Sequence, residues 1–331
     1  MVERITSAQN PKIKELLALQ EKSRERREKG LFVVEGRREL EHCLAAGFTI
    51  DTVFYCPAIY GSVLTGQGGH GLRGAEDLTP SGECSPKSTP ALTSDKAVDK
   101  AAVGAALQVA FPEGTKSSAA CNAVRTAAPH ASHTASGVRI IEVTPELYGK
   151  IAYRGGTEGI VAEVRARDLM LEDLQLGPDP LIVVLESVEK PGNLGAVLRS
   201  ADAAGADAVI VCDPLTDLFN PNLIRSSLGG IFTVPCVAVD SPSAIAWLKG
   251  HGIRILTAQL QDSVWYYDSD MKRGTAIVIG TESTGLTDIW REAADEHIRI
   301  PMLGRLDSLN ASVSAAILLF EAVRQRQARK Q

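Results

Sequence analysis

The sequence has few cysteines and few aromatic residues. Of its 331 residues, six are cysteines and 5% are aromatic. No two cysteines have the Cys-x-x-Cys spacing that is typical of a structural zinc site, and six are too few for the disulfide scaffold of a chain this long. We therefore expect reduced cysteines, as in a cytoplasmic protein.

Long apolar runs are also missing. No run approaches the roughly 18 residues of a transmembrane helix, and the apolar stretches 181–185 and 315–320 have the size of core elements. The opening residues, MVERITSAQNPKIK, are polar and charged where a secretory signal has its apolar segment. Both absences exclude a membrane protein and predict a cytoplasmic one. With 44% hydrophobic and 23% charged residues, the composition is that of a globular protein with a sizeable core.

Positive charge is not in excess overall, because the formal net charge is −5. This argues against a uniformly basic nucleic-acid-binding protein but allows a local basic patch. Residues 12–38 carry nine Lys or Arg against five Glu, and the last ten residues carry four basic side chains and no acid. Charge alone favours solvated helices over a binding surface, so an interaction with RNA needs further support.

One segment differs sharply in composition from the rest. Of the 77 residues 61–137, 46 are Ala, Gly, Ser, Thr or Pro, and only 11 are Val, Leu or Phe. Such a segment buries too little apolar surface to offset the entropy lost on ordering. We expect a disordered low-complexity insertion at 61–137, with a transient helix near 97–109.

The residues on either side of this insertion predict a small α/β domain over 1–165. Apolar residues at helical spacing predict one helix over 11–29, which Gly30 ends. Further helices are expected at 37–46 and 145–152, and strands at 31–34, 52–55, 138–143 and 159–164. Residues 166–180 have the composition of a linker.

Residues 181–331 predict a second α/β domain, because apolar strands alternate with helices. Such alternation is typical of a parallel sheet that helices cover on both faces. Strands are expected at 181–185, 208–211, 232–234, 254–258, 276–279 and 297–300. Helices are expected at 194–204, 221–228 and 242–249, and from residue 311 on.

Three segments of this second domain carry polar residues where strands meet turns or helices. In PGNLGAVLRSADAAG (191–205), Asn193 suits a helix start, Gly195 permits close backbone approach, and Arg199 suits an anionic ligand. In IVIGTESTGL (277–286), a turn containing Glu282 lies between glycines. In IPMLGRLDSLN (300–310), Ser308 and Asn310 stand before the last helix. Taken alone, the first segment is equally compatible with a surface salt bridge of Arg199, and the second favours a structural turn. In the third, helix capping explains one of the two polar residues but not both.

The order and spacing of the three segments resemble the SpoU/TrmH family of RNA ribose 2′-O-methyltransferases. The first family motif is an Asn followed six positions later by an Arg, as in Asn193 and Arg199. The second is a Gly-x-Glu-x-x-Gly turn, matched by Gly280, Glu282 and Gly285. The third is Ile-Pro-Met, a short loop and Ser-Leu-Asn, matched by Ile300, Pro301, Met302, Ser308, Leu309 and Asn310.

The N-terminal segments ITSAQNPKIKELLAL and FVVEGRRELEHCL also look like the substrate-binding domain of that family. Three features depart from the family pattern. The first is the sequence of Glu186–Asn193, the second is the presence of Arg305 and Asp307 in the third-motif loop, and the third is the insertion at 61–137. We expect none of them to remove activity, although the insertion bears on substrate choice.

The resemblance implies a knotted C-terminal domain over 181–331, S-adenosylmethionine as methyl donor, RNA as acceptor and a homodimer as the working unit. The N-terminal domain favours ribosomal RNA over tRNA as the substrate. In the family, main-chain groups hold the donor, and we assign this role to Gly280, Ile300 and Leu309. The candidate RNA contacts come from the basic segment: Arg26, Arg27, Arg37 and Arg38.

A ribose hydroxyl is a poor nucleophile at neutral pH, so its developing oxyanion must be stabilised. We expect Arg199 to do this electrostatically, because a guanidinium has a pKa far above neutral, stays protonated and is therefore a poor base. By resemblance, Asn193 would orient Arg199, Glu282 and Asn310 would hold the nucleotide and the loop, and Ser308 would support both. The leaving group is a neutral thioether, so no metal is expected.

Three alternative functions are open at the level of the sequence. The chain could methylate tRNA instead, or it could be a catalytically silent RNA-binding protein of the same fold; the complete set of motif residues argues against a silent protein. A Rossmann-type dehydrogenase or a conventional methyltransferase would need a Gly-x-Gly-x-x-Gly turn after the first strand of a domain, and neither domain has one.

Overall fold

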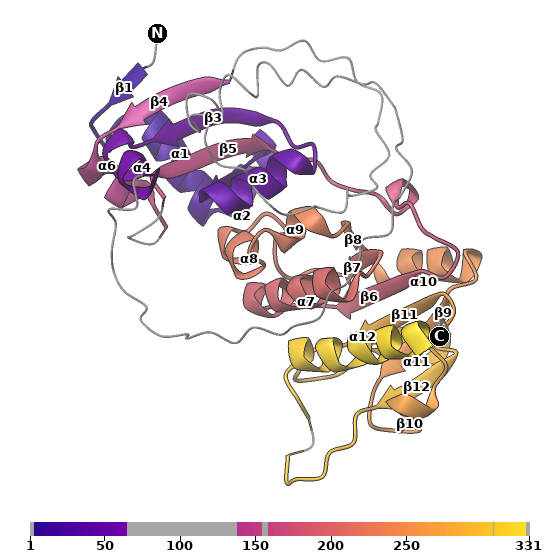
Figure 1. The fold of residues 1–331 in the computed structure, drawn as a ribbon. Helices are drawn as coiled ribbons and strands as arrows, with labels where there is room; N and C mark the ends of the chain where they lie inside the picture. Colours follow the sequence, from indigo (N-terminus) through magenta and orange to yellow (C-terminus); the bar gives the residue numbers. More distant parts are fainter. Residues whose placement is uncertain (1–2, 65–137, 154–157, 307, 329–331) are drawn as a thin grey trace, which may run out of the picture.

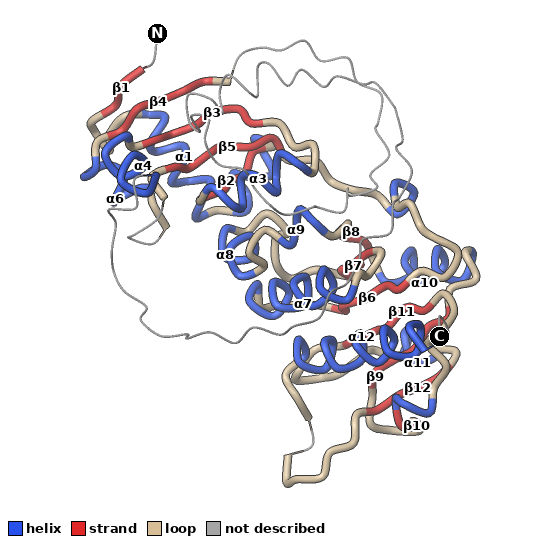
Figure 2. Tube along the Cα trace, in the orientation of Figure 1, coloured by secondary structure: helices blue, strands red, loops and turns tan. Residues whose placement is uncertain are grey.

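The computed structural model describes residues 3–64, 138–153, 158–306 and 308–328. Within them the chain forms two sheets, each with its own helices (Figures 1 and 2). The expected disordered insertion and its helix near 97–109 lie outside the described residues, except for residues 61–64. In the described part of the chain, no helix is long and apolar enough to cross a membrane.

The N-terminal sheet has five strands in the order β1-β4-β3-β5-β2. Strand β5 pairs antiparallel with β2 and β3, and the other pairs are parallel. The strands are β1 (Glu3–Ile5), β2 (Leu31–Glu35), β3 (Ile50–Tyr55), β4 (Arg139–Val143) and β5 (Ile160–Arg165). The helices are α1 (Pro11–Glu21), α2 (Ser23–Lys29), α3 (Arg37–Ala45), α4 (Pro57–Leu64) and α6 (Pro145–Ile151).

The single helix that we expected over residues 11–29 is two helices. Asn10 caps α1 by accepting a hydrogen bond from the Lys12 backbone N–H at 2.9 Å. Lys22 then adopts an extended conformation, with φ −114° and ψ 116°, which separates α1 from α2. Gly30 ends α2 in the left-handed conformation, with φ +61°, as the sequence predicts.

The C-terminal sheet has seven strands, all parallel, in the order β10-β12-β9-β11-β6-β7-β8. The strands are β6 (Leu181–Glu186), β7 (Ala208–Cys212), β8 (Cys236–Val239), β9 (Arg254–Ala258), β10 (Val264–Trp265), β11 (Thr275–Ile279) and β12 (Glu296–Arg299). The helices are α7 (Pro191–Ala204), α8 (Pro221–Ser226), α9 (Gly230–Thr233), α10 (Ser241–Gly250), α11 (Asp288–Ala293) and α12 (Ala311–Ala328). Two short 3₁₀ helices cover Leu171–Asp173 and Tyr266–Asp268.

Both faces of this sheet are buried, as a parallel sheet requires. In the inner strand β6, Leu181, Val183 and Leu185 face a core that includes α7 and α12. Ile182 and Val184 face a second core that includes α10 and α11. The near-continuous apolar sequence of the strand follows from this double burial.

The prediction of a strand at residues 232–234 is wrong. Phe232 lies in the short helix α9, is buried, and stacks at a centroid distance of 6.1 Å from Phe32 of the N-terminal domain. The strand of this region begins only at Cys236, after Pro235. A short apolar run did not distinguish a strand from a helix that packs against another domain.

The two domains are joined by apolar and ionic contacts. Phe32 of β2 stacks on Phe219 at a centroid distance of 4.3 Å, and Phe48 contacts the same ring edge-on at 6.1 Å. The guanidinium of Arg26 pairs with Asp217 at 2.6 Å. Helices α8 and α9 of the C-terminal domain therefore lie against the sheet and helices of the N-terminal domain (Figure 1).

Candidate active site

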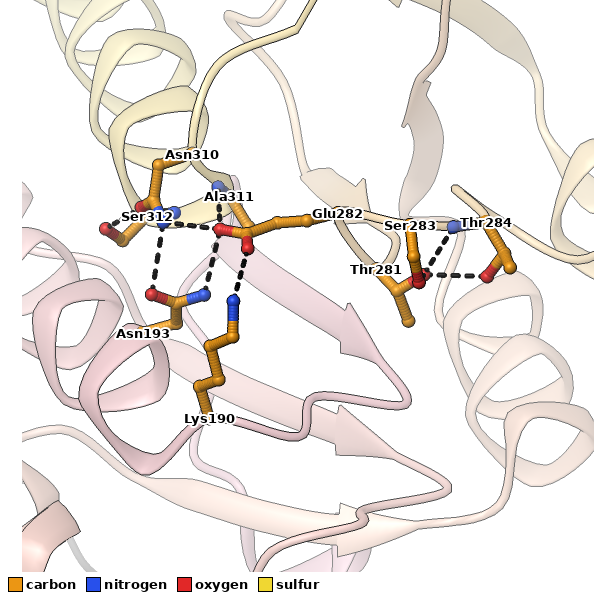
Figure 3. A network of polar contacts seen from close by, with 9 residues as sticks. All are labelled: Lys190, Asn193, Thr281, Glu282, Ser283, Thr284, Asn310, Ala311 and Ser312. Carbon is orange, nitrogen blue, oxygen red and sulfur yellow. Dashed lines mark hydrogen bonds and ion pairs between the residues drawn. The ribbon is translucent and has the colours of Figure 1, made fainter.

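Three segments that are far apart in the sequence meet at the carboxyl edge of the C-terminal sheet. Asn193 lies in the first turn of α7, after β6; Glu282 lies in the turn after β11; Asn310 directly precedes α12. Figure 3 shows the three side chains pointing toward one another. Open α/β sheets place their ligands at this edge.

Hydrogen bonds connect the three side chains directly. The Asn193 Nδ2 donates to Glu282 Oε1 at 3.1 Å, and the Asn310 Nδ2 donates to the same oxygen. The Asn310 Nδ2 also donates to Asn193 Oδ1 at 3.2 Å. Because Asn310 Oδ1 accepts from the Ser312 backbone N–H at 3.0 Å, the same asparagine begins α12 and orients the carboxylate.

Lys190 completes the network. Its ammonium lies 2.8 Å from Glu282 Oε2, and the Ala311 backbone N–H donates to the other carboxylate oxygen at 3.4 Å. These donors stabilise the ionised carboxylate, and they lower the pKa of Glu282 below its usual range, with Lys190 as the largest cause. Glu282 in turn raises the pKa of Lys190. Both groups are charged at neutral pH.

The turn that carries Glu282 closes on itself. The Thr281 N–H donates to the Gly285 carbonyl at 3.2 Å, and the Gly285 N–H donates back to the Thr281 carbonyl at 3.1 Å. A Cβ at position 280 would lie 2.3 Å from the carbonyl carbon of Gly285, which itself has φ +70°. The two positions therefore require glycine for different reasons. Position 280 lies too close to the Gly285 backbone for a side chain, and position 285 has a left-handed backbone conformation.

Glu186, which ends β6, holds the far side of this turn. Its carboxylate is buried and accepts a hydrogen bond from the Thr287 backbone N–H at 2.9 Å and another from the Thr287 hydroxyl. This links β6 to the start of α11. Glu186, which departs from the family sequence pattern, thus helps to hold the Glu282 turn in place.

The start of α7 is held by close packing on α8. A Cβ at Gly195 would lie 2.0 Å from the Ser226 hydroxyl oxygen, so only glycine permits this approach. The same hydroxyl donates to the Pro191 carbonyl at 3.2 Å. The close approach that the sequence suggested for Gly195 is therefore confirmed, and it places the helix turn that carries Asn193.

Two cavities lie on the two sides of the Glu282 turn. The larger, about 360 Å³, is lined by all three residues expected to hold the donor, Gly280, Ile300 and Leu309, and also by Ser308. The smaller, about 120 Å³, is lined by Asn193, Lys190 and the end of β6. Residues 279–283 form a wall of both cavities. Asp307 of the third-motif loop lies outside the described residues.

Arg199 is not part of this network. It lies on α7, six residues beyond Asn193, which separates the two residues by about 9 Å along the helix axis and turns them to different faces. Its side chain is exposed and makes no ion pair or hydrogen bond within the described residues. The expectation that Asn193 orients Arg199 is therefore not met, because the side-chain contacts of Asn193 run to Glu282 and Asn310.

The basic N-terminal segment divides into buried and exposed residues. Arg26 is buried and donates to the Leu19 carbonyl at 2.6 Å while it pairs with Asp217, so the assignment of Arg26 as an RNA contact is corrected. Arg27 and Arg38 are exposed. Arg37 is half-buried and its guanidinium donates to Glu41 at 2.8 Å.

Sequence reasoning missed Lys190. It stands three residues before Asn193, at the N-cap of α7, and a lysine is an uncommon cap because it offers no acceptor. That unusual residue type was the available signal. Its partner, Glu282, lies 92 residues away in the sequence, so spacing could not identify the ion pair.

Comparisons with known proteins define the class. Residues 180–320 match the SpoU rRNA Methylase family, and residues 10–76 match the MRM3-like substrate binding domain. The fold and the site are those of a SpoU-type methylase with an additional N-terminal domain. The chain belongs to the SpoU rRNA methylase family.

Among curated relatives, the 23S rRNA (uridine(2479)-2′-O)-methyltransferase of Streptomyces viridochromogenes is 37% identical over 172 residues, which is 50% of this chain and 59% of that protein. The 23S rRNA (guanosine-2′-O-)-methyltransferase RlmB of Ralstonia nicotianae is 37% identical over 198 residues, or 58% of this chain and 79% of that protein. The AdoMet-bound rRNA methyltransferase of Sinorhizobium meliloti is similar in structure, with a TM-score of 0.72, 26% identity and coverage of 98% of both chains.

Proposed function

We propose that this protein transfers a methyl group from S-adenosylmethionine to a ribose 2′-hydroxyl of ribosomal RNA. The observation that carries the proposal is the convergence of Asn193, Glu282 and Asn310 at the wall between two cavities. The family, the two curated relatives and the N-terminal match to a substrate-binding domain agree with it.

The larger cavity fits the methyl donor. Gly280 has no side chain, and a Cβ there would collide with Gly285, so main-chain groups are presented to the cavity at this point. Ile300 and Leu309 add further main chain and apolar surface. When bound, the donor supplies an activated methyl group on a sulfonium. We assign its binding to Gly280, Ile300 and Leu309, with Ser308 beside them.

The smaller cavity receives the acceptor ribose. Lys190 and Asn193 line it, and the ionised Glu282 stands between it and the donor cavity. A carboxylate held by four donors, two from the start of α7 and two from the start of α12, is fixed in position, and fixed groups promote transfer by orienting the reactants. We assign to Glu282 and Asn310 the task of keeping the two cavities aligned.

Arg199 remains our candidate for stabilising the 2′-oxyanion. Its exposed guanidinium has no partner among the described residues, so its charge is available to a substrate phosphate or to the developing alkoxide. As the methyl group moves from the sulfonium to the 2′-oxygen, the hydroxyl proton passes to solvent water, and a guanidinium lowers the energy of the developing oxyanion without accepting the proton.

We further propose a trefoil knot, a homodimer and a cytoplasmic location. The sheet order supports the knot, because the last strand β12 enters between β9 and β10 before α12 packs back against α7. The dimer is supported by Val313 and Phe320, which are seven residues apart on α12 and 46% and 48% exposed. Light scattering in solution measures the mass, and a mass of one chain would contradict the dimer.

The direct test incubates the protein with methyl-labelled donor and separate fractions of 23S rRNA, 16S rRNA and tRNA. We expect label in rRNA and, at the modified position, resistance to alkaline hydrolysis, because a 2′-O-methyl group blocks strand cleavage. Label in tRNA alone would overturn the substrate assignment. Label that leaves every linkage sensitive to alkali would overturn ribose methylation.

A further inference from the structure

Three buried polar atoms that have no hydrogen-bond partner among the described residues belong to side chains that line the larger cavity. They are the Oε1 of Gln259, the Nε of Arg291 and the Nε of Arg299, and all three residues line the cavity. Buried polar groups are nearly always hydrogen-bonded, so three unsatisfied atoms around one cavity indicate a polar ligand. Such a ligand must offer an acceptor to the arginines and a donor to the glutamine.

Strand register places two of the three side chains together. Thr257 pairs with His297 between β9 and β12, and their side chains are hydrogen-bonded at 2.6 Å, so they share one face of the sheet. Arg299 lies two residues beyond His297 in β12. Gln259 lies two residues beyond Thr257, one residue past the end of β9, where its N–H donates to the Ile298 carbonyl at 3.0 Å, and side chains two apart in extended backbone share a face. Gln259 and Arg299 are therefore neighbours at the cavity edge.

Local contacts fix the orientation of both side chains. Gln259 Nε2 donates to the Gln261 carbonyl at 3.0 Å, which leaves Oε1 as the free acceptor. Arg299 is the register partner of Trp265, and its guanidinium carbon lies 4.3 Å from the centroid of that ring. This cation–π contact holds Arg299 in place without using a hydrogen-bond donor, and its Nη1 donates to the Leu260 carbonyl at 3.5 Å.

The charges of the cavity are separated along its walls. Glu282 provides the negative charge, and its carboxylate is already paired with Lys190. Arg291 and Arg299 provide positive charge, and within the described part of the chain Arg291 forms one ion pair, a 3.5 Å contact to the exposed Asp288. A ligand with a cation for the Glu282 wall and a carboxylate for the arginine wall is complementary to this arrangement.

We propose that Arg299, together with Arg291 and Gln259, recognises the amino-acid end of the methyl donor, and that Trp265 positions Arg299. The α-carboxylate accepts from the two guanidinium groups, and the α-ammonium donates to Gln259 Oε1. This inference rests on the proposed function, because it assigns the larger cavity to S-adenosylmethionine. The three side chains would select ligands that carry the amino-acid end, which main-chain contacts to the rest of the donor do not do.

The test is calorimetric and needs no turnover. The wild-type protein is titrated with S-adenosylhomocysteine, which retains the amino-acid end, and with 5′-methylthioadenosine, which lacks it. We expect the first ligand to bind about ten- to hundredfold more tightly, since only this ligand forms the charge-assisted hydrogen bonds to the guanidinium groups. Arg299→Gln removes most of this difference by weakening S-adenosylhomocysteine alone. Trp265→Leu reduces it by a smaller factor.

Arg305→Gln is the matched control, because Arg305 lies in the exposed third-motif loop and does not line the cavity. We expect it to bind both ligands as the wild type does. Thermal melting of each variant tests the fold, and Arg291→Gln is the second variant if Arg299→Gln melts early. A wild type that does not distinguish the two ligands overturns the inference. So does a folded Arg299 variant that loses both ligands equally.

The same experiment separates this inference from the proposed function. Binding of both ligands with equal affinity, together with methyl transfer to rRNA, would reject the arginine set and retain the function. Failure of the wild type to bind either ligand would reject the donor assignment of the cavity, on which both proposals depend.

Discussion

Arg26 of the N-terminal domain and Asp217 of the C-terminal domain form an ion pair at 2.6 Å, with only 5% and 18% of their side chains exposed. The same guanidinium donates to the Leu19 and Gln20 carbonyls, at 2.6 and 3.2 Å. The basic residue at the centre of the positively charged N-terminal segment thus joins the domains. Its charge is neutralised within the fold and is not available to RNA.

Replacing Arg26 is therefore expected to affect stability first. Arg26→Ala leaves Asp217 mostly buried without its partner, and breaking such a pair destabilises by about 3–5 kcal/mol. Urea unfolding measures the loss. The control is Arg27→Ala, whose exposed side chain predicts a change within about 0.5 kcal/mol. Equal stability of both variants would show that the pair contributes nothing to the domain contact.

Arg199→Ala is expected to abolish methyl transfer and to leave donor binding nearly unchanged. Arg199 does not line the donor cavity, and its proposed task concerns the acceptor oxygen. Transfer of labelled methyl groups and calorimetry with S-adenosylhomocysteine measure the two properties separately. A collapse of donor affinity in this variant would contradict the role that we assign to Arg199.

The packing of α7 on α8 makes a steric prediction. Gly195→Ala places a methyl group 2.0 Å from the Ser226 hydroxyl oxygen, and such overpacking destabilises by about 1–3 kcal/mol. It also displaces the turn that carries Asn193, so methyl transfer falls with stability. Gly192→Ala is the matched control in the same helix, because a Cβ there meets nothing within 4 Å. If Gly195→Ala keeps the stability and the methyl transfer of the wild type, α8 shifts to accommodate the added methyl group and the packing prediction is wrong.

Glu163 of β5 predicts a dependence of stability on pH. Burial is the largest cause that raises its pKa to about 7, and the nearby Glu15 adds to it. A carboxyl with a raised pKa in the folded state stabilises fully below its unfolded pKa, and this contribution is lost as the pH rises through about 7. The loss is of the order of 3 kcal/mol at most.

Urea unfolding between pH 5 and pH 8 measures this dependence. We expect the free energy of unfolding to fall over this range, and Glu163→Gln, which stays neutral, to flatten the curve and to be the more stable form at pH 8. An identical pH dependence in the variant would assign the effect to other groups.

The exposed arginines of the N-terminal segment make a prediction about salt. Arg27→Glu combined with Arg38→Glu is expected to weaken RNA binding and to reduce the slope of log affinity against log salt concentration, because fewer counterions are released. Arg26 is not substituted in this variant, so its ion pair between the two domains is preserved. An unchanged slope would move RNA recognition to another surface.

The sequence by itself determined the fold class and most members of the site. Apolar periodicity located five of the seven strands of the parallel sheet, and the spacing of three motifs identified Asn193, Glu282 and Asn310. Local patterns suffice here because strand burial and turn geometry leave marks within a few residues. The demand for glycine at position 195 was visible for the same reason.

Only the tertiary structure decided which of these residues touch. The ion pair of Lys190 with Glu282 spans 92 residues, and that of Arg26 with Asp217 spans 191. The strand expected at residues 232–234 lies at 236–239, because Phe232 belongs to a short helix that packs against the N-terminal domain. Burial and charge neutralisation depend on partners that folding brings together, and a one-dimensional pattern carries no record of them.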